Sequence, residues 1–300
     1  MQKPLRMVLE RRPHTAAILD GRLPPPRGLR VEFTEVRPVN RAFRRMVRDL
    51  EFDICEMAVV THYLARAHGC PVVALPVFVA RHFPAAAVEG RADRGITAPA
   101  ALEGARVGAR SYTMTTAVWA RGVLSRQFGV DLGKVTWVVS DIEHVPGLSL
   151  PANVERVADA DLRAMLRGGE LDAGIGLAVR DEPVRPLWPD TAAVNRQWLA
   201  RAGALPANHT VVAREELLRD DPVLAAEIFA WFTAAQRLAT PPPGEAGQAS
   251  VSEVNEAAVP YGLTAANRTC LGLLLDLTRE QLPEETRLPR SVDEAFLDVR

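Results

Sequence analysis

The sequence is almost without lysine. Lys3 and Lys134 are the only two, so arginine supplies nearly all of the 36 positive charges. Schiff-base catalysis requires a lysine in a desolvated pocket, but Lys3 lies near the chain's start and Lys134 in a polar turn. This scarcity argues against Schiff-base chemistry. We attribute the arginine excess to GC-rich coding, so bidentate carboxylate binding concerns only the one or two arginines that face a ligand.

Cysteine is also scarce, and motifs for metals or nucleotides are absent. Cys55, Cys70 and Cys270 are odd in number, form no Cys-x-x-Cys pair and lie in apolar segments, as expected of reduced core thiols. The six histidines lack metal-ligand spacing, and no Gly-x-Gly-x-x-Gly, Walker or Gly-x-Ser-x-Gly motif occurs. The sequence therefore predicts no metal and no cofactor, and it does not support a serine hydrolase of that type.

Strong net charge and long apolar runs are absent as well. A net charge of -1 and a pI near 6.6 provide no general attraction to nucleic acid or to an anionic membrane. No uninterrupted apolar run reaches the ~20 residues that a membrane-spanning helix needs. The N-terminal residues also lack the apolar region of a secretory signal. We therefore expect a soluble, cytoplasmic protein with no nucleic-acid or membrane partner.

Short apolar strands alternate with amphipathic helices, which predicts an α/β fold with mainly parallel sheets. Strands are expected at residues 5–9, 29–33, 52–58, 72–79, 106–109, 135–139, 171–177 and 209–213. Helices are expected at residues 40–50, 61–68, 115–128, 160–167 and 221–238.

Length and apolar content predict two lobes. Three hundred residues exceed what one core usually serves, and 48% apolar residues suffice for two cores. Turn residues and a short capped helix interrupt the pattern at 91–104, so we place lobe 2 at 88–204. Lobe 1 then comprises 1–87 and 205–300, because strand 209–213 returns the chain to it. Residues 241–250 have the composition of a low-complexity loop.

The most informative stretch, residues 106–122, joins an apolar strand to a hydroxyl-rich helix start. It runs Arg-Val-Gly-Ala-Arg-Ser-Tyr-Thr-Met-Thr-Thr-Ala-Val-Trp-Ala-Arg-Gly. Amide donors at the helix start, together with Thr113, Thr115 and Thr116, predict a seat for an anion. For any single threonine, ordinary helix capping is the alternative.

This stretch is one of five collinear motifs between residues 5 and 235. The others are Phe-Asp-Ile-Cys-Glu-Met at 52–57, Pro-Val-Phe-Val-Ala-Arg-His-Phe at 76–83, Gly-Glu-Leu-Asp-Ala at 169–173 and Pro-Ala-Asn-His-Thr-Val-Val at 206–212. In these motifs the chain resembles the 4,5-dihydroxyphthalate decarboxylase family. The resemblance implies a two-lobed α/β fold of the type 2 periplasmic-binding-protein kind, with a ligand cleft between the lobes.

Two departures from the family's pattern concern the substrate. Where members carry an acidic and aromatic pair after the first strand, this chain has Arg-Arg-Pro-His-Thr at 11–15. Ala85 stands where a histidine commonly follows the Arg-x-Phe motif. A different acid as substrate, or binding without turnover, therefore stays open.

Residues that follow strands are the candidates for the cleft, because ligands of open parallel sheets bind beyond the carboxyl ends of the strands. This rule selects His14, Thr15, Glu56, Arg81, His82, Tyr112 to Thr116, Asp141, Glu143, Asn208 and His209.

Carboxylate binding is assigned first to Arg81, whose guanidinium matches a carboxylate bidentately, with a structural ion pair as the alternative. In an extended segment Arg81 and His82 point to opposite faces, so only one of them can enter the site, and we favour Arg81. Tyr112 would donate to the ligand or stack on it, or simply pack half-buried. The predicted substrate-binding residues are Arg81, His82, Tyr112, Thr113, Thr115, Thr116 and Asn208.

Decarboxylation of a hydroxylated ring without a cofactor needs one acid and one base. His209 opens an apolar strand and His14 follows one, and an imidazole titrates near neutral pH. Either is a candidate proton donor, with a core role for His209 and a solvated loop for His14 as alternatives. Glu56 interrupts an apolar strand, so it is either a base or a structural partner of an arginine or helix terminus.

Three functions remain open. The favoured one is a cofactor-independent carboxy-lyase, a decarboxylase acting on a small hydroxylated aromatic carboxylic or dicarboxylic acid of the 4,5-dihydroxyphthalate type. The second is a solute-binding protein of an ABC transporter that uses the same cleft for capture alone. The third is another lyase of this fold, such as a relative of the chorismate dehydratases of menaquinone synthesis. The expected partner is a small anionic carboxylate ligand, and apolar terminal helices would permit a homodimer.

Overall fold

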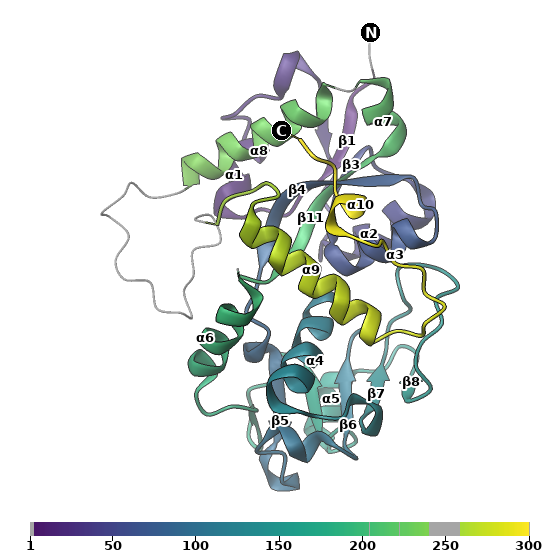
Figure 1. Ribbon diagram of the computed structural model, residues 1–300, viewed down its shortest axis with the longest axis vertical. Coiled ribbons are helices and arrows are strands. Elements are labelled where there is room, and N and C mark those ends of the chain that lie inside the picture. The colour runs from purple at the N-terminus through teal and green to yellow at the C-terminus, as the bar shows by residue number, and fades with distance from the viewer. Residues whose placement is uncertain (1–2, 204, 222, 240–258, 300) are drawn as a thin grey trace. The chain divides into compact units, whose positions relative to one another are not determined.

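The computed structural model describes residues 3–203, 205–221, 223–239 and 259–299, and the chain divides into two units (Figure 1). Unit 1 comprises Met1–Arg81, Ala207–Gly272 and Arg287–Arg300, and unit 2 comprises His82–Pro206 and Leu273–Thr286. The predicted lobes change over at 88 and 205 and keep residues 273–286 in lobe 1. Those residues group with unit 2 because Leu277 packs against Gly122. The predicted loop at 241–250 lies outside the described residues.

Unit 1 is built on a five-stranded sheet in the order β2-β1-β3-β11-β4. Strands β1 (Leu5–Val8), β2 (Val31–Phe33) and β3 (Ile54–Ala58) are parallel, and β11 (Ala207–Arg214) runs antiparallel to both β3 and β4 (Val72–Arg81). His209 therefore lies opposite Ala58, at the end of β3. The start of β11 thus lies at the sheet edge where the parallel strands end.

Helix α1 (Pro13–Leu19) follows β1 directly and was not among the predicted helices. Pro13 occupies its first turn, where the missing N–H costs nothing. The Thr15 hydroxyl accepts from the Arg12 amide and donates to the Glu10 carbonyl, which fixes the entry of the chain. The alternative of a solvated loop for His14 is therefore wrong, because the residue is helical and buried.

Three further helices of unit 1 were predicted and have shifted ends, namely α2 (Asn40–Asp49), α3 (Val59–Ala67) and α8 (Leu224–Ala239). Unit 1 also contains α7 (Glu215–Asp220), which was not predicted, the first part of α9 (Ala265–Glu280) and α10 (Val292–Ala295). Helix α8 packs against α1.

Unit 2 contains a six-stranded sheet in the order β10-β5-β9-β6-β7-β8. Strands β6 (Arg106–Ala109), β7 (Thr136–Val139), β8 (Val154–Arg156) and β9 (Ala173–Ile175) are parallel, whereas β5 (Val88–Arg91) and β10 (Val184–Pro186) form the antiparallel side. The sequence did not predict β5, β8 and β10, which are only three or four residues long. Helices α4 (Thr115–Phe128), α5 (Leu162–Gly168) and α6 (Thr191–Ala202) complete the unit.

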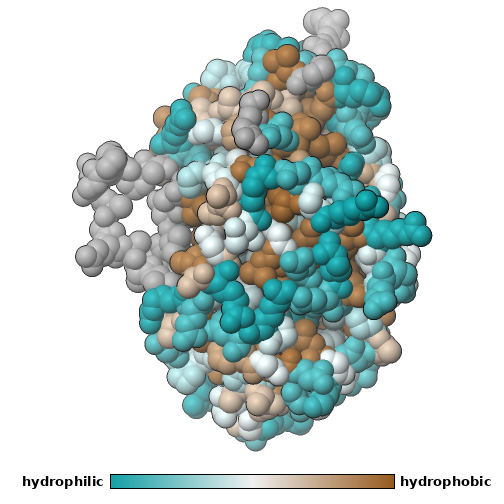
Figure 2. All heavy atoms as spheres, viewed as in Figure 1, coloured by the Kyte–Doolittle hydropathy of each residue, from teal (hydrophilic) through white to brown (hydrophobic). Residues whose placement is uncertain are grey.

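Both units bury apolar cores, and few large apolar side chains are exposed. In the described residues these are Phe33, Phe128, Val157, Val223 and Leu238. On the face shown in Figure 2, hydrophobic residues lie interspersed among hydrophilic ones. Among the described residues, no helix combines the length and the apolar character needed to cross a bilayer. The predicted homodimer stays a prediction.

Candidate functional site

The carboxyl edge of the unit 1 sheet gathers polar residues from four strands. Residues 10–15 follow β1, Glu56 lies within β3, Arg81 ends β4, and His209 lies near the start of β11. Ligands of open α/β sheets bind at this edge. The edge is therefore the candidate site of unit 1.

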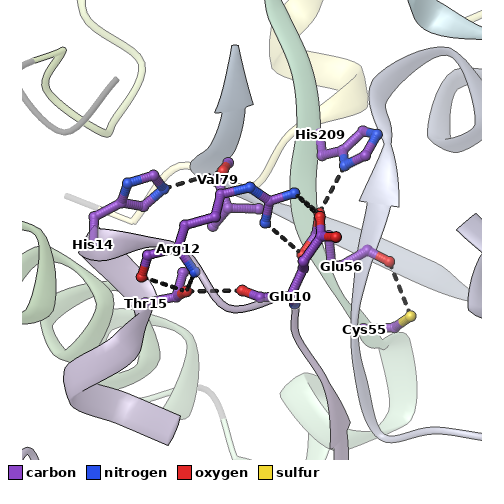
Figure 3. A network of polar contacts seen from close by, with 8 residues as sticks. All are labelled: Glu10, Arg12, His14, Thr15, Cys55, Glu56, Val79 and His209. Atoms are coloured by element: carbon purple, nitrogen blue, oxygen red, sulfur yellow. Dashed lines mark hydrogen bonds and ion pairs between the residues drawn. The ribbon is translucent and has the colours of Figure 1, made fainter. Parts of the chain in front are cut away.

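Glu56 is the centre of a polar network at this edge (Figure 3). Its side chain has no solvent exposure, although it interrupts an apolar strand. Arg12 donates bidentately, from Nη1 to Oε2 at 2.9 Å and from Nη2 to Oε1 at 2.8 Å. The Glu10 amide donates to Oε2 at 2.9 Å, and His209 Nδ1 lies 2.7 Å from Oε1. Four donors satisfy the buried carboxylate, and together they offset the free-energy cost of removing its charge from water.

The network keeps Glu56 ionised. Burial raises the pKa of Glu56, but the hydrogen bond and charge of His209, together with Arg12, outweigh it and lower the pKa to about 2. The carboxylate therefore accepts hydrogen bonds and does not supply a proton near neutral pH. Of the two roles predicted for Glu56, the pairing with an arginine is present in its contacts with Arg12, and the role as a base stays a prediction.

His209 is the accessible member of the network. Because a carboxylate can only accept, the 2.7 Å contact to Glu56 requires the proton on Nδ1 of His209. Nε2 is then the atom that can take up and release a proton. The side chain is 21% exposed, and the ring of Phe43 meets the imidazole edge-on at 5.1 Å. The geometry is that of a histidine oriented by a carboxylate.

His14 is close by but enclosed. Its Nε2 lies 3.1 Å from the Val79 carbonyl, which can only accept, and the side chain is buried. Burial lowers the pKa of His14 and outweighs the opposing hydrogen bond to Val79. These features favour a neutral, packed imidazole over an exchanging proton donor.

Arg81 and its neighbours lie at the end of β4. Arg81 is buried, donates from Nη2 to Asn267 Oδ1 at 2.8 Å and lies over the Phe78 ring at 4.9 Å. His82 is exposed, as expected for alternating side chains, and Asn208 is buried beside His209 in β11. Arg81 thus has a protein partner, and its role as a carboxylate clamp stays a prediction.

In unit 2, the turn between β6 and α4 holds an internal carboxylate. The Tyr112 amide donates to Glu143 Oε1 at 2.7 Å, the Thr113 amide lies 3.3 Å from Oε2, and the Thr113 hydroxyl also donates to Oε2. Met114, and not a threonine, occupies the N-cap position of α4, and its side chain makes no capping hydrogen bond. Thr115 is buried and Thr116 half-buried in the first turn. In the structure, Tyr112 and Thr113 therefore bind the carboxylate of Glu143, and the ligand seat predicted at Thr113, Thr115 and Thr116 stays a prediction.

Arg121 braces the same turn and is completely buried. Its guanidinium lies over the rings of Tyr112 at 4.0 Å and Trp137 at 5.2 Å. Nη2 donates to the Tyr112 carbonyl at 2.6 Å and Nε to Gln281 Oε1 at 2.7 Å. Tyr112 in turn donates its hydroxyl to the Gln281 carbonyl.

His209, Glu56 and His14 lie at one sheet edge as the sequence predicts, whereas Arg12 and Arg121 were not among the predicted site residues. Arg12 could have been found from Pro13, which marks a helix start and fixes the preceding residue near the strand end. Arg121 lies within the stretch 106–122, but no role was predicted for it. Arg81 belongs to unit 1 and residues 112–116 to unit 2, so the prediction that they share a cleft stays a prediction.

Among the described residues, this sheet edge holds no group of metal ligands, and two cavities lie elsewhere in the chain. Within the described ranges, no group of three or more histidine, cysteine, aspartate or glutamate side chains could hold a metal ion. A cavity of about 650 Å³ in unit 1 is lined by Leu5, Asp53 and Arg214, at the opposite, amino edge of β1 and β3. In unit 2, a cavity of about 270 Å³ borders Tyr112 and Gln281.

Comparison with known proteins confirms the resemblance predicted from the motifs. No protein-family model matches the chain. The chain is 32% identical over 212 residues to the 4,5-dihydroxyphthalate decarboxylase of Comamonas testosteroni, covering 66% of this chain and 64% of that protein. It is 38% identical over 143 residues to the 4,5-dihydroxyphthalate decarboxylase of Pseudomonas putida, covering 45% and 55%. The matched regions thus span less than two thirds of either relative.

Solved structures confirm the fold. The chain is similar to the alkanesulfonate-binding protein SsuA from Xanthomonas axonopodis pv. citri, with a TM-score of 0.57, 14% identity and 98% coverage of both chains. It is also similar to a periplasmic sulfonate-binding protein SsuA from Methylobacillus flagellatus KT, with a TM-score of 0.60, 11% identity and coverage of 99% and 92%. The fold is therefore the predicted two-unit α/β fold of periplasmic binding proteins.

Proposed function

We propose that this chain is a carboxy-lyase that removes CO2 from 4,5-dihydroxyphthalate or a closely similar hydroxylated aromatic acid, without a cofactor. The similarity to two proteins named 4,5-dihydroxyphthalate decarboxylase supports the substrate class. The main structural support for the proposal is the accessible His209 at the carboxyl edge of the unit 1 sheet, where the buried, ionised Glu56 fixes its orientation. A solute-binding protein needs donors for its ligand, but it does not need an oriented proton carrier.

The proposed reaction uses His209 as the proton carrier. The protonated imidazole delivers the Nε2 proton to the ring carbon that bears the leaving carboxylate. The hydroxyl para to that carbon supplies electron density as the new C–H bond forms. The C–C bond to the carboxylate then breaks, CO2 leaves, and the electron pair of that bond restores the aromatic ring. His209 regains a proton from water, so one proton is consumed for each CO2 released.

Glu56 and Arg12 hold the carrier in place. The Glu56 carboxylate fixes the tautomer of His209 and stabilises the imidazolium, while Arg12 and the Glu10 amide keep that carboxylate ionised and oriented. In this proposal Glu56 does not abstract a proton. Arg81 supplies the fork for one carboxylate of the substrate.

The test is an incubation of the purified protein with hydroxylated aromatic mono- and dicarboxylic acids, with released CO2 recorded. Release from 4,5-dihydroxyphthalate by the wild-type protein, at a rate that falls at least about a hundredfold in His209→Ala, supports the proposal. Binding of an acid with no CO2 release from any of them would contradict it. Chorismate in the same panel, with dehydration product measured, tests the other lyase.

Capture without turnover is the second candidate, because the solved structures of similar fold are named as sulfonate-binding proteins. An alkanesulfonate such as MOPS serves as its probe. Tight binding of the sulfonate, with no CO2 released from any aromatic acid, is the outcome that favours this candidate over the carboxy-lyase.

A further inference from the structure

The turn at 111–114 in unit 2 is a built carboxylate-binding site. Two backbone amides, those of Tyr112 and Thr113, and the buried hydroxyl of Thr113 converge on one carboxylate. These three donors follow β6, and the carboxylate of Glu143 arrives from the loop that follows β7. Both segments leave the carboxyl edge of parallel strands, which is where ligands of this class of sheet bind.

A buried cation, Arg121, contacts the carbonyl group of the turn. Arg121 is wholly enclosed, and its Nη1 has no hydrogen-bond partner among the described residues. Nη2 donates to the Tyr112 carbonyl, so the guanidinium faces the same peptide that presents the first amide donor. Burial lowers the pKa of Arg121, and the charge of Glu143 acts in the opposite direction by raising it. A fixed positive charge beside converging donors makes this turn selective for anions.

Glu143 itself is only half-buried, unlike the donors that hold it. Its carboxylate is therefore bound by a fixed site and is reachable from one side. Any other carboxylate that used these donors would have to take the place of Glu143, because three donors serve one carboxylate.

We propose that the Tyr112–Thr113 turn is the seat for one carboxylate of the ligand and that Glu143 competes for it, so that Glu143 sets how strongly a ligand must bind. The inference rests on the proposed function for the identity of the ligand. It deepens that function by assigning to unit 2 a subsite for one carboxylate, which a ligand occupies only when it displaces Glu143.

The experiment measures binding of phthalate, a dicarboxylate without ring hydroxyls, by titration calorimetry to the wild-type protein and to Glu143→Gln. The glutamine carbonyl oxygen still accepts from one of the two amides, but the side-chain NH2 group donates and cannot accept from the remaining donors, so the neutral side chain is displaced more easily than a carboxylate. We expect the Kd for phthalate to fall about tenfold. Glu155→Gln is the matched control, because Glu155 pairs with Arg106 at the surface of unit 2, and its Kd should equal that of the wild type.

A second readout uses the wild-type protein and does not depend on how the variant folds. In protein labelled with ¹³C at the glutamate carboxyls, the resonance of Glu143 should shift as phthalate is added, because the carboxylate leaves its donors. A Kd that is unchanged or higher in Glu143→Gln, an unmoved Glu143 resonance, or no phthalate binding at all would each overturn the inference. Tighter binding to Glu143→Gln without any CO2 release from 4,5-dihydroxyphthalate would instead overturn the proposed function and support the seat.

Discussion

His209 Nδ1 lies 2.7 Å from Oε1 of Glu56, and the two side chains come from adjacent antiparallel strands, β11 and β3. One partner is 21% exposed and the other has no exposure. The pair therefore joins an imidazole that solvent can reach to a counter-charge that solvent cannot reach. This division of roles is what the proposed chemistry requires of an acid with a fixed orientation.

Replacing His209 by Ala should slow turnover while leaving substrate binding largely intact. We expect kcat for 4,5-dihydroxyphthalate to fall about 10²- to 10⁴-fold, the usual contribution of a general acid, with KM changed only a few-fold. The measurement is steady-state CO2 release at saturating and limiting substrate.

The matched control is His68→Ala. His68 is exposed at the end of α3, where its Nδ1 contacts the Leu64 carbonyl, and it belongs to no polar network of the site. Its kcat should equal that of the wild type. Wild-type kcat in His209→Ala, with both proteins folded, would remove the assignment.

Glu56→Gln should lower the stability of the protein in a pH-dependent way. The variant leaves Arg12 without its buried carboxylate, so we expect a loss of about 3–5 kcal/mol in the free energy of unfolding at neutral pH. The pKa of Glu56 is about 2 in the folded protein and 4.5 ordinarily. A carboxyl with a lowered pKa stabilises the fold above its ordinary pKa, and that stabilisation is lost as pH falls through the folded value. The difference from wild type should therefore be constant above about pH 5 and shrink toward pH 2.

Urea unfolding of the wild type and the variant across that range provides the measurement. Asp181→Asn is a suitable comparison, because the exposed Asp181 pairs with Arg167 at the surface, so its replacement should cost less than about 1 kcal/mol. A Glu56→Gln penalty that does not change between pH 6 and pH 3 would show that the carboxylate is not the stabilising species.

The sequence predicted the buried strands β3 and β4 well because their apolar runs are continuous. Ile54 to Ala58 and Val72 to Arg81 are buried almost throughout, and both were found within two residues of their ends. Strands β5, β8 and β10 carry no such signal. They are short and pair at or near the sheet edge, so only the neighbouring strand defines them.

In the site, too, features with a local sequence signal were predicted and features that depend on distant partners were not. The expectation that ligands bind at the carboxyl ends of strands identified His209 and Glu56, because His209 opens an apolar strand and Glu56 interrupts one. The contacts between Arg12 and Glu56, and between Glu143 and Thr113, join residues 44 and 30 positions apart. Such pairings depend on which loops meet at the edge of the sheet, and no local pattern records them. For this reason the sequence left the partner of Glu56 open and described the anion seat without its internal carboxylate.

Arg81→Lys should weaken substrate binding, because a lysine keeps the charge but cannot present a two-pronged donor. We expect KM for 4,5-dihydroxyphthalate to rise at least tenfold, with kcat changed less. Arg219→Lys, an exposed arginine on α7, is the control and should leave KM unchanged.

Asn267→Ala separates the clamp from a purely structural role of Arg81. Asn267 accepts from Arg81 and anchors itself to the carbonyls of Pro260 and Gly262. If Arg81 only fastens α9 to β4, both variants should lose stability and neither should change KM. A normal KM in folded Arg81→Lys would therefore withdraw the clamp.

Gly122→Ala should destabilise unit 2, although alanine is the better helix former. A Cβ at position 122 in α4 would lie 2.4 Å from Cδ1 and 2.9 Å from Cδ2 of Leu277, which is itself fully buried in α9. The alanine gains about 1 kcal/mol of helix propensity, whereas forcing a methyl group into a packed interior costs about 1–3 kcal/mol. Two leucine methyl groups must move at once, so we expect the cost to exceed the gain and the melting temperature to fall by a few degrees.

Gly168→Ala tests the same substitution where there is room. Gly168 ends α5, and the nearest atom to a Cβ there is a Glu170 carboxylate oxygen at 3.8 Å. Its melting temperature should stay the same or rise slightly, because propensity acts without a steric penalty. If Gly122→Ala also melts at or above the wild-type temperature, then α4 and α9 pack with more freedom than the Gly122–Leu277 contact implies. The grouping of residues 273–286 with unit 2 would then owe little to that contact, and it would have to rest on the hydrogen bonds of Gln281 to Arg121 and Val118.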